Sequence, residues 1–207
     1  MKIQEKNKIG RICIKMPLFP CCSTTFWKNQ HLFTKTYLEQ KPGYLLTQEA
    51  GILDDEGYLS VFGHFEEIIY SNENMAPHQY ENLILTNSKV LECVVFSFYN
   101  DQNRGAIPIA LVILSDSSKF AVSGYKSKLS SELKNMIKSK FGQNRKMGGV
   151  LVAEEILKSK DGRVSRTIIR RIFNGERLED YEIAQFDKNQ VEKFKLLRDD
   201  FIRKIRS

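Results

Sequence analysis

Two long apolar runs, 90–98 and 107–114, most constrain the fold of this chain, because each has the length and residue types of a buried strand. The polar segment 99–105 separates them and predicts a turn. A helix is expected after them from an apolar stripe at helical spacing, formed by Leu129, Leu133, Met136, Ile137 and Phe141. A short strand at 150–153 and a helix at 166–173 follow. This order of elements predicts an α+β unit in which helices pack on a small mixed sheet.

The part of the chain before these runs is predicted to be rich in strands. Short stretches of alternating or apolar residues, bounded by Gly, Pro and Asp, favour strands that are joined by turns. The expected elements are strands at 11–15, 44–47, 58–63 and 67–70, a helix at 30–40, a polar loop at 71–74 and a helix that starts near Pro77.

Composition excludes several classes of protein. With 42% hydrophobic and 28% charged residues, the chain is expected to be globular and soluble. No apolar run approaches the length of a membrane span, and residues 1–8 lack the apolar core of a secretory signal. Its four cysteines follow no C-x-x-C spacing and its three histidines are scattered, so we expect no metal site and a reducing compartment.

The net charge of +7 arises mainly from residues 126–146 and 188–206. Such a basic balance is compatible with a lysine-rich surface, or with binding to a nucleic acid, a membrane surface or a phosphate-rich ligand. Aromatic residues do not interleave with the basic runs as stacking platforms would, and binding to a nucleic acid or a membrane surface is the least favoured of these interpretations.

One motif points to a family. The segment Ser159-Lys160-Asp161-Gly162-Arg163, followed by Val164–Arg171, resembles the C-terminal signature of AMP-forming acyl-CoA synthetases and luciferase-like ligases. Further segments are similar to motifs of acetyl- and propionyl-CoA synthetases, in the same order and at similar separations: 17–27, 42–47, 54–59 and 63–69.

The resemblance implies a division of the chain into three parts. Residues 10–65 would be the terminal, β-rich portion of the large AMP-binding domain, and 66–175 the small C-terminal domain of such enzymes, with a mixed sheet packed by helices. Residues 176–207 would form a charged helical tail. The family's upstream phosphate loop has no counterpart here, so most of the ATP-binding region is expected to be absent from these 207 residues.

Several positions depart from the residues that carry chemistry in the family. Arg163 stands where a lysine contacts the acyl carboxylate and the nucleotide, and it is planar and bulkier than lysine. Gln48 and Glu49 replace the Gly-Asp of a Thr-Gly-Asp motif. Glu49 keeps a carboxylate for the ribose hydroxyls but extends it by one methylene. His64 replaces an arginine that contacts the nucleotide, and a histidine is shorter and mostly neutral at pH 7.

Two further positions concern movement and the second substrate. Glu66 stands at the family's interdomain hinge, where the backbone rotates between two domain orientations. Asn72, Glu73 and Asn74 occupy the glycine-containing loop that borders the CoA tunnel. Asn72 takes the glycine's place most nearly, and a side chain there would crowd a pantetheine arm.

The sequence leaves two main hypotheses of function. The first is a C-terminal fragment of a short-chain acyl-CoA ligase, inactive or weak alone, for which the resemblance implies ATP with Mg²⁺ and CoA, and the missing ATP-binding domain or another protein as partner. The alternative is a non-catalytic domain that binds a protein or a CoA-like ligand. In either case we expect the cytoplasm or the mitochondrial matrix, with CoA or an acyl-adenylate as possible ligands.

Overall fold

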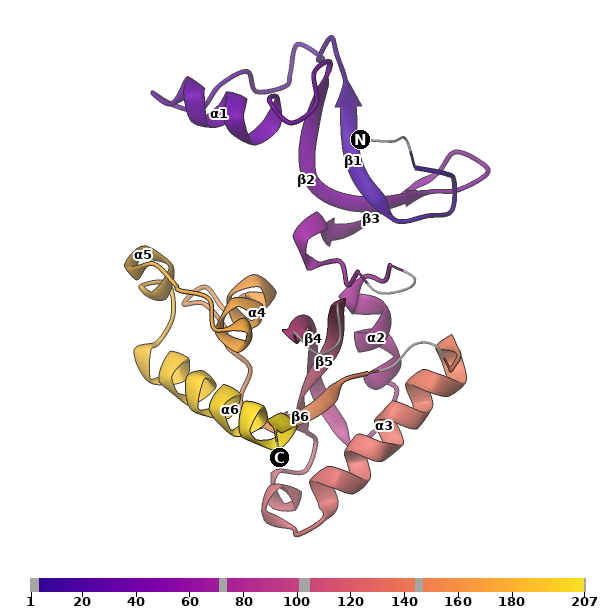
Figure 1. Ribbon diagram of the computed structural model, residues 1–207, viewed down its shortest axis with the longest axis vertical. Coiled ribbons are helices and arrows are strands. Elements are labelled where there is room, and N and C mark those ends of the chain that lie inside the picture. Colours follow the sequence, from indigo (N-terminus) through magenta and orange to yellow (C-terminus); the bar gives the residue numbers. More distant parts are fainter. Residues whose placement is uncertain (1–3, 71–73, 101–104, 144–146, 207) are drawn as a thin grey trace. The chain divides into compact units, whose positions relative to one another are not determined.

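The strands of the chain form two separate three-stranded sheets, shown in Figure 1. The computed structural model describes residues 4–70, 74–100, 105–143 and 147–206. The chain divides into two units, Met1–Ile68 (unit 1) and Ile69–Ser207 (unit 2), each with one sheet and its own helices. The expected α+β fold class is confirmed.

Unit 1 contains strands β1 (Gly10–Lys15), β2 (Tyr44–Leu53) and β3 (Leu59–His64), which pair antiparallel in that order. Strand β2 continues well beyond the 44–47 predicted from the sequence, because β3 pairs with its second half. The predicted turn joins β2 to β3, and the Asp54 carboxylate accepts the backbone N–H of Tyr58 at 2.8 Å.

Helix α1 (Gln30–Tyr37) lies against β2 in unit 1 and is shorter than the predicted 30–40. It begins where the side chain of Asn29 accepts the N–H of Leu32 at 3.1 Å, which satisfies one of the free N–H groups of the first turn. The buried ring of Phe33 meets Phe26 and Tyr37 at centroid distances of 5.4 and 5.2 Å. These rings form a small aromatic cluster beside β2.

The strand predicted at 67–70 is wrong. Phe65–Glu67 forms a 3-10 turn, and only a single bridge between Ile69 and Met75 follows it. The apolar residues Ile68 and Ile69 are buried, with relative exposures of 1% and 0%. A buried connecting segment therefore has the same apolar pattern as a short buried strand.

Unit 2 is built on strands β4 (Val90–Asn100), β5 (Gly105–Leu114) and β6 (Gly149–Ala153). β4 and β5 pair antiparallel, whereas β5 and β6 pair parallel, so the sheet is mixed as predicted. The parallel pair requires a crossover connection, and helix α3 (Tyr125–Phe141) provides it.

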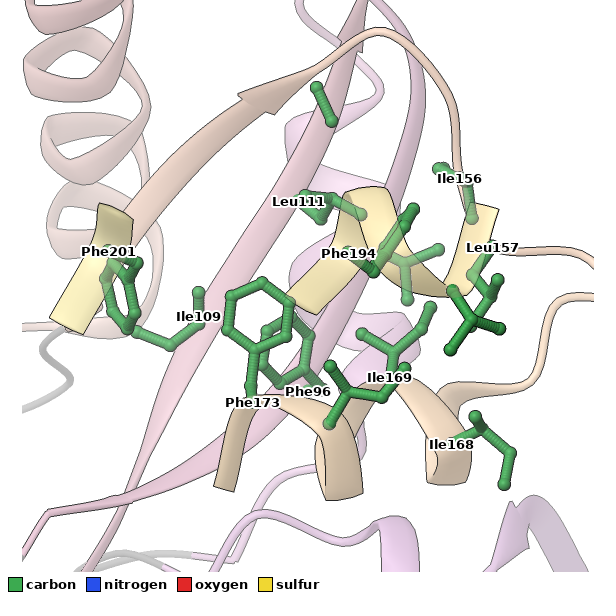
Figure 2. Close-up of a cluster of buried hydrophobic side chains, with 14 of the residues drawn as sticks. Phe96, Ile109, Leu111, Ile156, Leu157, Ile168, Ile169, Phe173, Phe194 and Phe201 are labelled. Carbon is green, nitrogen blue, oxygen red and sulfur yellow. The ribbon is translucent and has the colours of Figure 1, made fainter. Parts of the chain in front are cut away.

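Each face of this sheet is covered by two helices (Figure 1). Helices α2 (Pro77–Ile84) and α3 cover one face, around residues that include Tyr80, Val95 and Leu133. On the other face lie α4 (Arg166–Asn174) and α6 (Lys188–Arg206). Figure 2 shows the core on that face, where the rings of Phe96 and Phe173 lie 4.8 Å apart.

The charged tail that was expected after residue 176 contributes directly to this core. It contains the short helix α5 (Asp180–Ile183) and the long helix α6, whose Val191, Phe194 and Phe201 are buried. A side chain at Gly149 of β6 would come within 3.1 Å of the Phe201 ring, so the glycine lets this ring pack close to the strand. The apolar stripe of the tail is therefore intramolecular packing.

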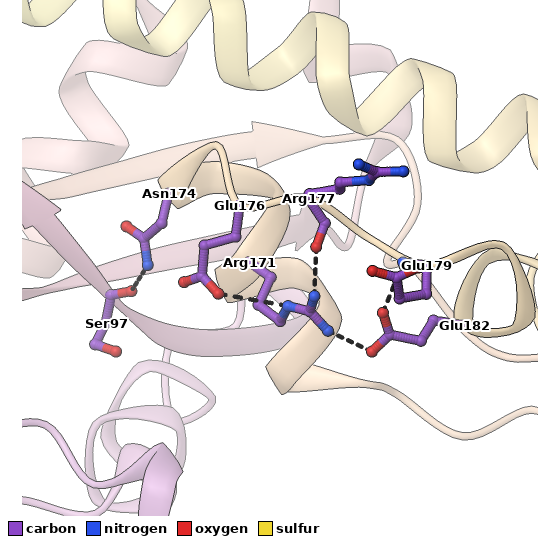
Figure 3. A network of polar contacts seen from close by, with 7 residues as sticks. All are labelled: Ser97, Arg171, Asn174, Glu176, Arg177, Glu179 and Glu182. Carbon is purple, nitrogen blue, oxygen red and sulfur yellow. Dashed lines mark hydrogen bonds and ion pairs between the residues drawn. The ribbon is translucent and has the colours of Figure 1, made fainter.

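Arg171 of α4 holds the start of the tail in place, as Figure 3 shows. Its guanidinium forms ion pairs with Glu176, at 3.4 Å, and with Glu182, and it donates to the backbone carbonyl of Arg177. Glu182 also accepts the N–H of Glu179 at 2.8 Å, which caps α5. These contacts connect α4 with the segment that leads into α6.

Replacing Val191 with alanine is expected to lower the free energy of unfolding by about 2 kcal/mol, because two buried methyl groups are lost and a cavity remains. Chemical denaturation followed by circular dichroism measures this loss. The control is Leu196→Ala on the same helix, where the side chain is 65% exposed and the expected change is below about 0.5 kcal/mol. Equal effects of the two substitutions would show that α6 is not docked on the sheet.

Candidate functional site

The signature segment forms a tight hairpin between Lys158 and Val164, which pair as an antiparallel bridge. The N–H of Ser159 donates to the carbonyl of Arg163 and the N–H of Gly162 donates to the carbonyl of Ser159, both at 2.8 Å. Gly162 has a φ of +83°, as the third residue of a three-residue hairpin loop requires. The hairpin leads directly into helix α4, so its tip is held by a rigid element.

Arg163 presents its guanidinium to solvent from this hairpin. Its side chain is 86% exposed, and its Nε lies 3.3 Å from an Oδ of Asp161. Asp161 also accepts a hydrogen bond from the Ser159 hydroxyl, and this bond, followed by the charge of Arg163, holds the pKa of Asp161 below its usual range. An ion pair this exposed stabilises the protein little, so the guanidinium can exchange Asp161 for another anion.

Replacing Gly162 with alanine is expected to destabilise the hairpin by about 1 kcal/mol, because a Cβ is unfavourable at positive φ. Among the described residues, and apart from Gly162 and its two neighbours in the chain, no atom lies within 4 Å of the position that the Cβ would take, so the effect comes from the backbone. Gly162→Asn is the control, since asparagine tolerates this conformation better. Thermal unfolding of both variants checks the prediction, and an alanine variant as stable as wild type would contradict it.

Glu49 and His64, the two predicted nucleotide-binding residues, are brought together in unit 1. They are directly opposed on β2 and β3, with Glu49 half-buried and His64 exposed. The hydroxyl of Thr47 fixes this part of β2, because it donates to the carbonyl of Ile12 at 2.7 Å and accepts the N–H of Glu49 at 3.2 Å. The pair offers a carboxylate from the middle of β2 beside an imidazole at the end of β3.

Gln48 has a local partner that the sequence did not reveal. The guanidinium of Arg11 on β1 donates to the Gln48 side chain at 3.3 Å and to the backbone carbonyl of Thr47 at 2.7 Å. It also lies over the ring of Phe65, 5.7 Å from the centroid. Arg11 therefore holds the altered Thr-Gln-Glu motif in place. In the sequence, Arg11 was visible only as a charged residue within an alternating strand.

The residues predicted for the hinge and the CoA loop lie around the link between the units. Glu66 is exposed in the 3-10 turn Phe65–Glu67, just before the end of unit 1. Asn74 is exposed and directly precedes Met75, which exchanges backbone hydrogen bonds with Ile69. Asn72 and Glu73 lie outside the described residues. The roles assigned to these positions stay predictions.

The predicted site is thus divided between the units. Glu49, His64 and Glu66 belong to unit 1, whereas Arg163 and Asn74 belong to unit 2, on different elements. In the described part of the chain, no three His, Cys, Asp or Glu side chains gather closely enough to hold a metal ion. The functional groups available are therefore the exposed guanidinium of Arg163 on unit 2 and the carboxylate–imidazole pair of Glu49 and His64 on unit 1.

Comparison with solved structures identifies the fold. Acetoacetyl-CoA synthetase from Streptomyces lividans superposes with a TM-score of 0.74 at 14% identity, covering 95% of this chain and 29% of that one. O-succinylbenzoate CoA synthetase (MenE) from Bacillus subtilis, in complex with AMP, gives a TM-score of 0.58 at 21% identity, over 79% of this chain and 30% of that one. The fold is that of the C-terminal part of adenylate-forming synthetases.

Sequence comparison identifies homologues of the chain. The mitochondrial acyl-CoA synthetase short-chain family member B of Dictyostelium discoideum is 29% identical over 197 residues, which are 92% of this chain and 28% of that protein. No protein-family model matches the chain. Its homologues are short-chain acyl-CoA synthetases, as the resemblance of the Ser159–Arg163 signature predicted. The chain spans little more than a quarter of the length of this relative.

Proposed function

We propose that the chain acts as the C-terminal part of an AMP-forming short-chain acyl-CoA synthetase of the acetate- or propionate-activating type, and that it is inactive or weak alone. The observation that carries this proposal is the 29% identity to a short-chain acyl-CoA synthetase over 92% of the chain. Since 72% of that relative has no counterpart in these residues, the binding of ATP requires another domain.

The hairpin geometry supports a role in forming the adenylate. In this reaction the acyl carboxylate attacks the α-phosphorus of ATP, pyrophosphate leaves, and CoA then displaces AMP to form the thioester. Arg163 would approach the carboxylate and the nucleotide, because its guanidinium is exposed and can accommodate an oxyanion through two N–H groups. Glu49 and His64 would face the nucleotide.

The proposed ligands and domain roles follow from the same assignment. MenE has been solved with ATP and a magnesium ion, and with its acyl-adenylate intermediate, which supports ATP, Mg²⁺ and an acyl-adenylate as ligands of the assembled enzyme. We assign residues 10–65 to the end of the AMP-binding domain, 66–175 to the mobile C-terminal domain and 176–207 to its tail. Glu66 would act as the hinge, and the loop at 72–74 would border the path of CoA.

For localisation, we propose the cytoplasm or the mitochondrial matrix. The Dictyostelium relative carries "mitochondrial" in its name. Among the described residues, none of the helices combines the length and the apolar character needed to cross a membrane.

A chimera tests the proposed function. The part of the Dictyostelium relative that lies upstream of the matched region is fused to this full chain, and acetate- and propionate-dependent ATP–pyrophosphate exchange is measured. We expect exchange from the chimera and none above background from the chain alone. The upstream part alone is the control. A folded chimera that gives no exchange, with either Arg163 or lysine at that position, would refute the ligase assignment.

The alternative, a non-catalytic domain, is favoured by one observation. Two of the altered positions already have local partners, because Gln48 accepts from Arg11 and Arg163 pairs with Asp161. Thermal shift measurements with CoA, with AMP and without ligand separate the two functions. Stabilisation by CoA of a chain whose chimera stays inactive would support the alternative.

A further inference from the structure

Strand β2 bulges away from β1 at residues 47–49, the segment that contains the predicted ribose-binding carboxylate. The register between the strands pairs Cys13 with Leu46 and then Arg11 with Ala50, so residues 47–49 have no paired residue on β1. The extra residues of a bulge lack the regular backbone ladder, and bulges are common beside active sites because they redirect side chains. The position of the carboxylate therefore depends on the contacts that replace the ladder.

Arg11 supplies most of these contacts. Its Nε donates to the carbonyl of Thr47 at 2.7 Å, its Nη2 to the side chain of Gln48 at 3.3 Å and its Nη1 to the side chain of Gln40 at 3.0 Å. The Thr47 hydroxyl adds one further bond, to the carbonyl of Ile12 at 2.7 Å. A guanidinium is planar and presents its N–H groups in a fixed fork, so three bonds from one group define a single geometry for the bulge.

The same guanidinium also contacts the segment that follows β3. It lies over the ring of Phe65, 5.7 Å from the centroid, and an aromatic face attracts a cation in this position. Phe65 directly follows His64, and Gln48 directly precedes Glu49, which pairs with His64 across the two strands. Arg11 therefore contacts a chain neighbour of each member of the carboxylate–imidazole pair.

We propose that Arg11 is a positioning residue for an adenine nucleotide: it holds the bulge and the end of β3 so that Glu49 and His64 meet the nucleotide in one arrangement. This inference rests on the proposed function. Without the guanidinium, the Thr47 carbonyl and the Gln48 side chain lose these partners, and the bulge gains alternative conformations. Binding of the nucleotide must then order the segment, and this cost weakens the affinity.

Kinetics of the chimera with the upstream part of the Dictyostelium relative test the proposal, with ATP–pyrophosphate exchange measured at saturating carboxylate. Arg11→Ala is expected to raise the KM for ATP about 10-fold and to leave kcat within about 2-fold, because binding common to the ground and transition states is lost. Arg11→Lys keeps one donor without the fork, so we expect a KM about 3-fold above wild type. The matched control is Lys15→Ala, an exposed cation at the end of β1, with a KM within about 2-fold of wild type.

A mutant cycle separates positioning from a merely structural role. In a chimera that already carries Glu49→Ala and His64→Ala, adding Arg11→Ala is expected to change the KM for ATP by less than about 2-fold, because the residues through which Arg11 acts are gone. Independent effects would multiply, and a further 10-fold rise in KM in this background would therefore overturn the proposal.

Two other results also overturn it: a KM for ATP that Arg11→Ala leaves unchanged, and a loss of kcat at unchanged KM. If circular dichroism shows that Arg11→Ala does not fold, Arg11→Lys takes its place in the comparison and in the cycle. Failure of this inference is distinguishable from failure of the proposed function. A wild-type chimera without exchange refutes the ligase assignment and the role of Arg11 with it, whereas an active chimera whose KM for ATP is insensitive to Arg11 refutes the positioning role alone.

Discussion

Replacing Arg163 with lysine is expected to raise adenylation about 100-fold in the chimera with the upstream part of the Dictyostelium relative. The expected gain is large because a donor that is misplaced by about 1 Å at a reacting centre costs on the order of 100-fold in rate. A lysine ammonium is a compact charge on a flexible stem, whereas the guanidinium is wide and planar. The measurement is carboxylate-dependent ATP–pyrophosphate exchange at saturating substrates, so that kcat is compared.

Two controls make the result specific. Arg203→Lys on α6 makes the same chemical change at an equally solvated position, 77% exposed, and is expected to leave the rate unchanged. Arg163→Ala removes the charge and is expected to be slower than wild type. Because the Arg163 side chain is 86% exposed, none of its substitutions should alter the unfolding temperature appreciably. A lysine variant no faster than wild type would show that the hairpin does not reach the reacting atoms.

The central sheet could be predicted from the sequence because its strands are continuously apolar. Strands β4 and β5 nevertheless extend beyond the predicted 90–98 and 107–114, since Tyr99 and Asn100 continue the ladder with Ala106 and Gly105. Backbone pairing does not depend on side-chain polarity once two strands are aligned. The strand predicted at 67–70 failed for the opposite reason, because its apolar residues are buried without a ladder.

The candidate site was predictable only where a motif is local. The Ser159–Arg163 signature could be recognised from five consecutive residues, and the structure places it in a hairpin in which Gly162 has a positive φ. Arg11, in contrast, donates to a side chain 37 residues away, and no periodicity reveals such a partner. The opposition of Glu49 and His64 likewise depends on the register between β2 and β3, which a bulge beside Gly51 shifts.

One contact that the sequence did not predict ties the signature segment to the rest of unit 2. Arg166, the first residue of α4, reaches Glu81 on α2 across 85 positions, with its Nη2 3.0 and 3.1 Å from the two carboxylate oxygens. Glu81 also accepts the backbone N–H of Val95 on β4 at 2.8 Å. The two side chains are only 24% and 12% exposed, so this ion pair is largely shielded from water. The start of α4, just after the hairpin, is thereby fixed to α2 and to the sheet.

Replacing Arg166 with leucine is expected to lower the free energy of unfolding by about 3 kcal/mol, because it leaves the charge of Glu81 buried without a counter-charge. The double variant Glu81→Gln/Arg166→Leu should recover most of this loss, since glutamine carries no charge and its oxygen can still accept the Val95 N–H. Denaturant unfolding of the single and double variants measures the coupling. Hydrogen–deuterium exchange should show faster exchange in β4 of the Arg166→Leu variant and unchanged exchange in β1 to β3, which belong to the other unit. If the double variant were as unstable as Arg166→Leu, the loss would come from the packing of the arginine side chain and not from the unpaired carboxylate.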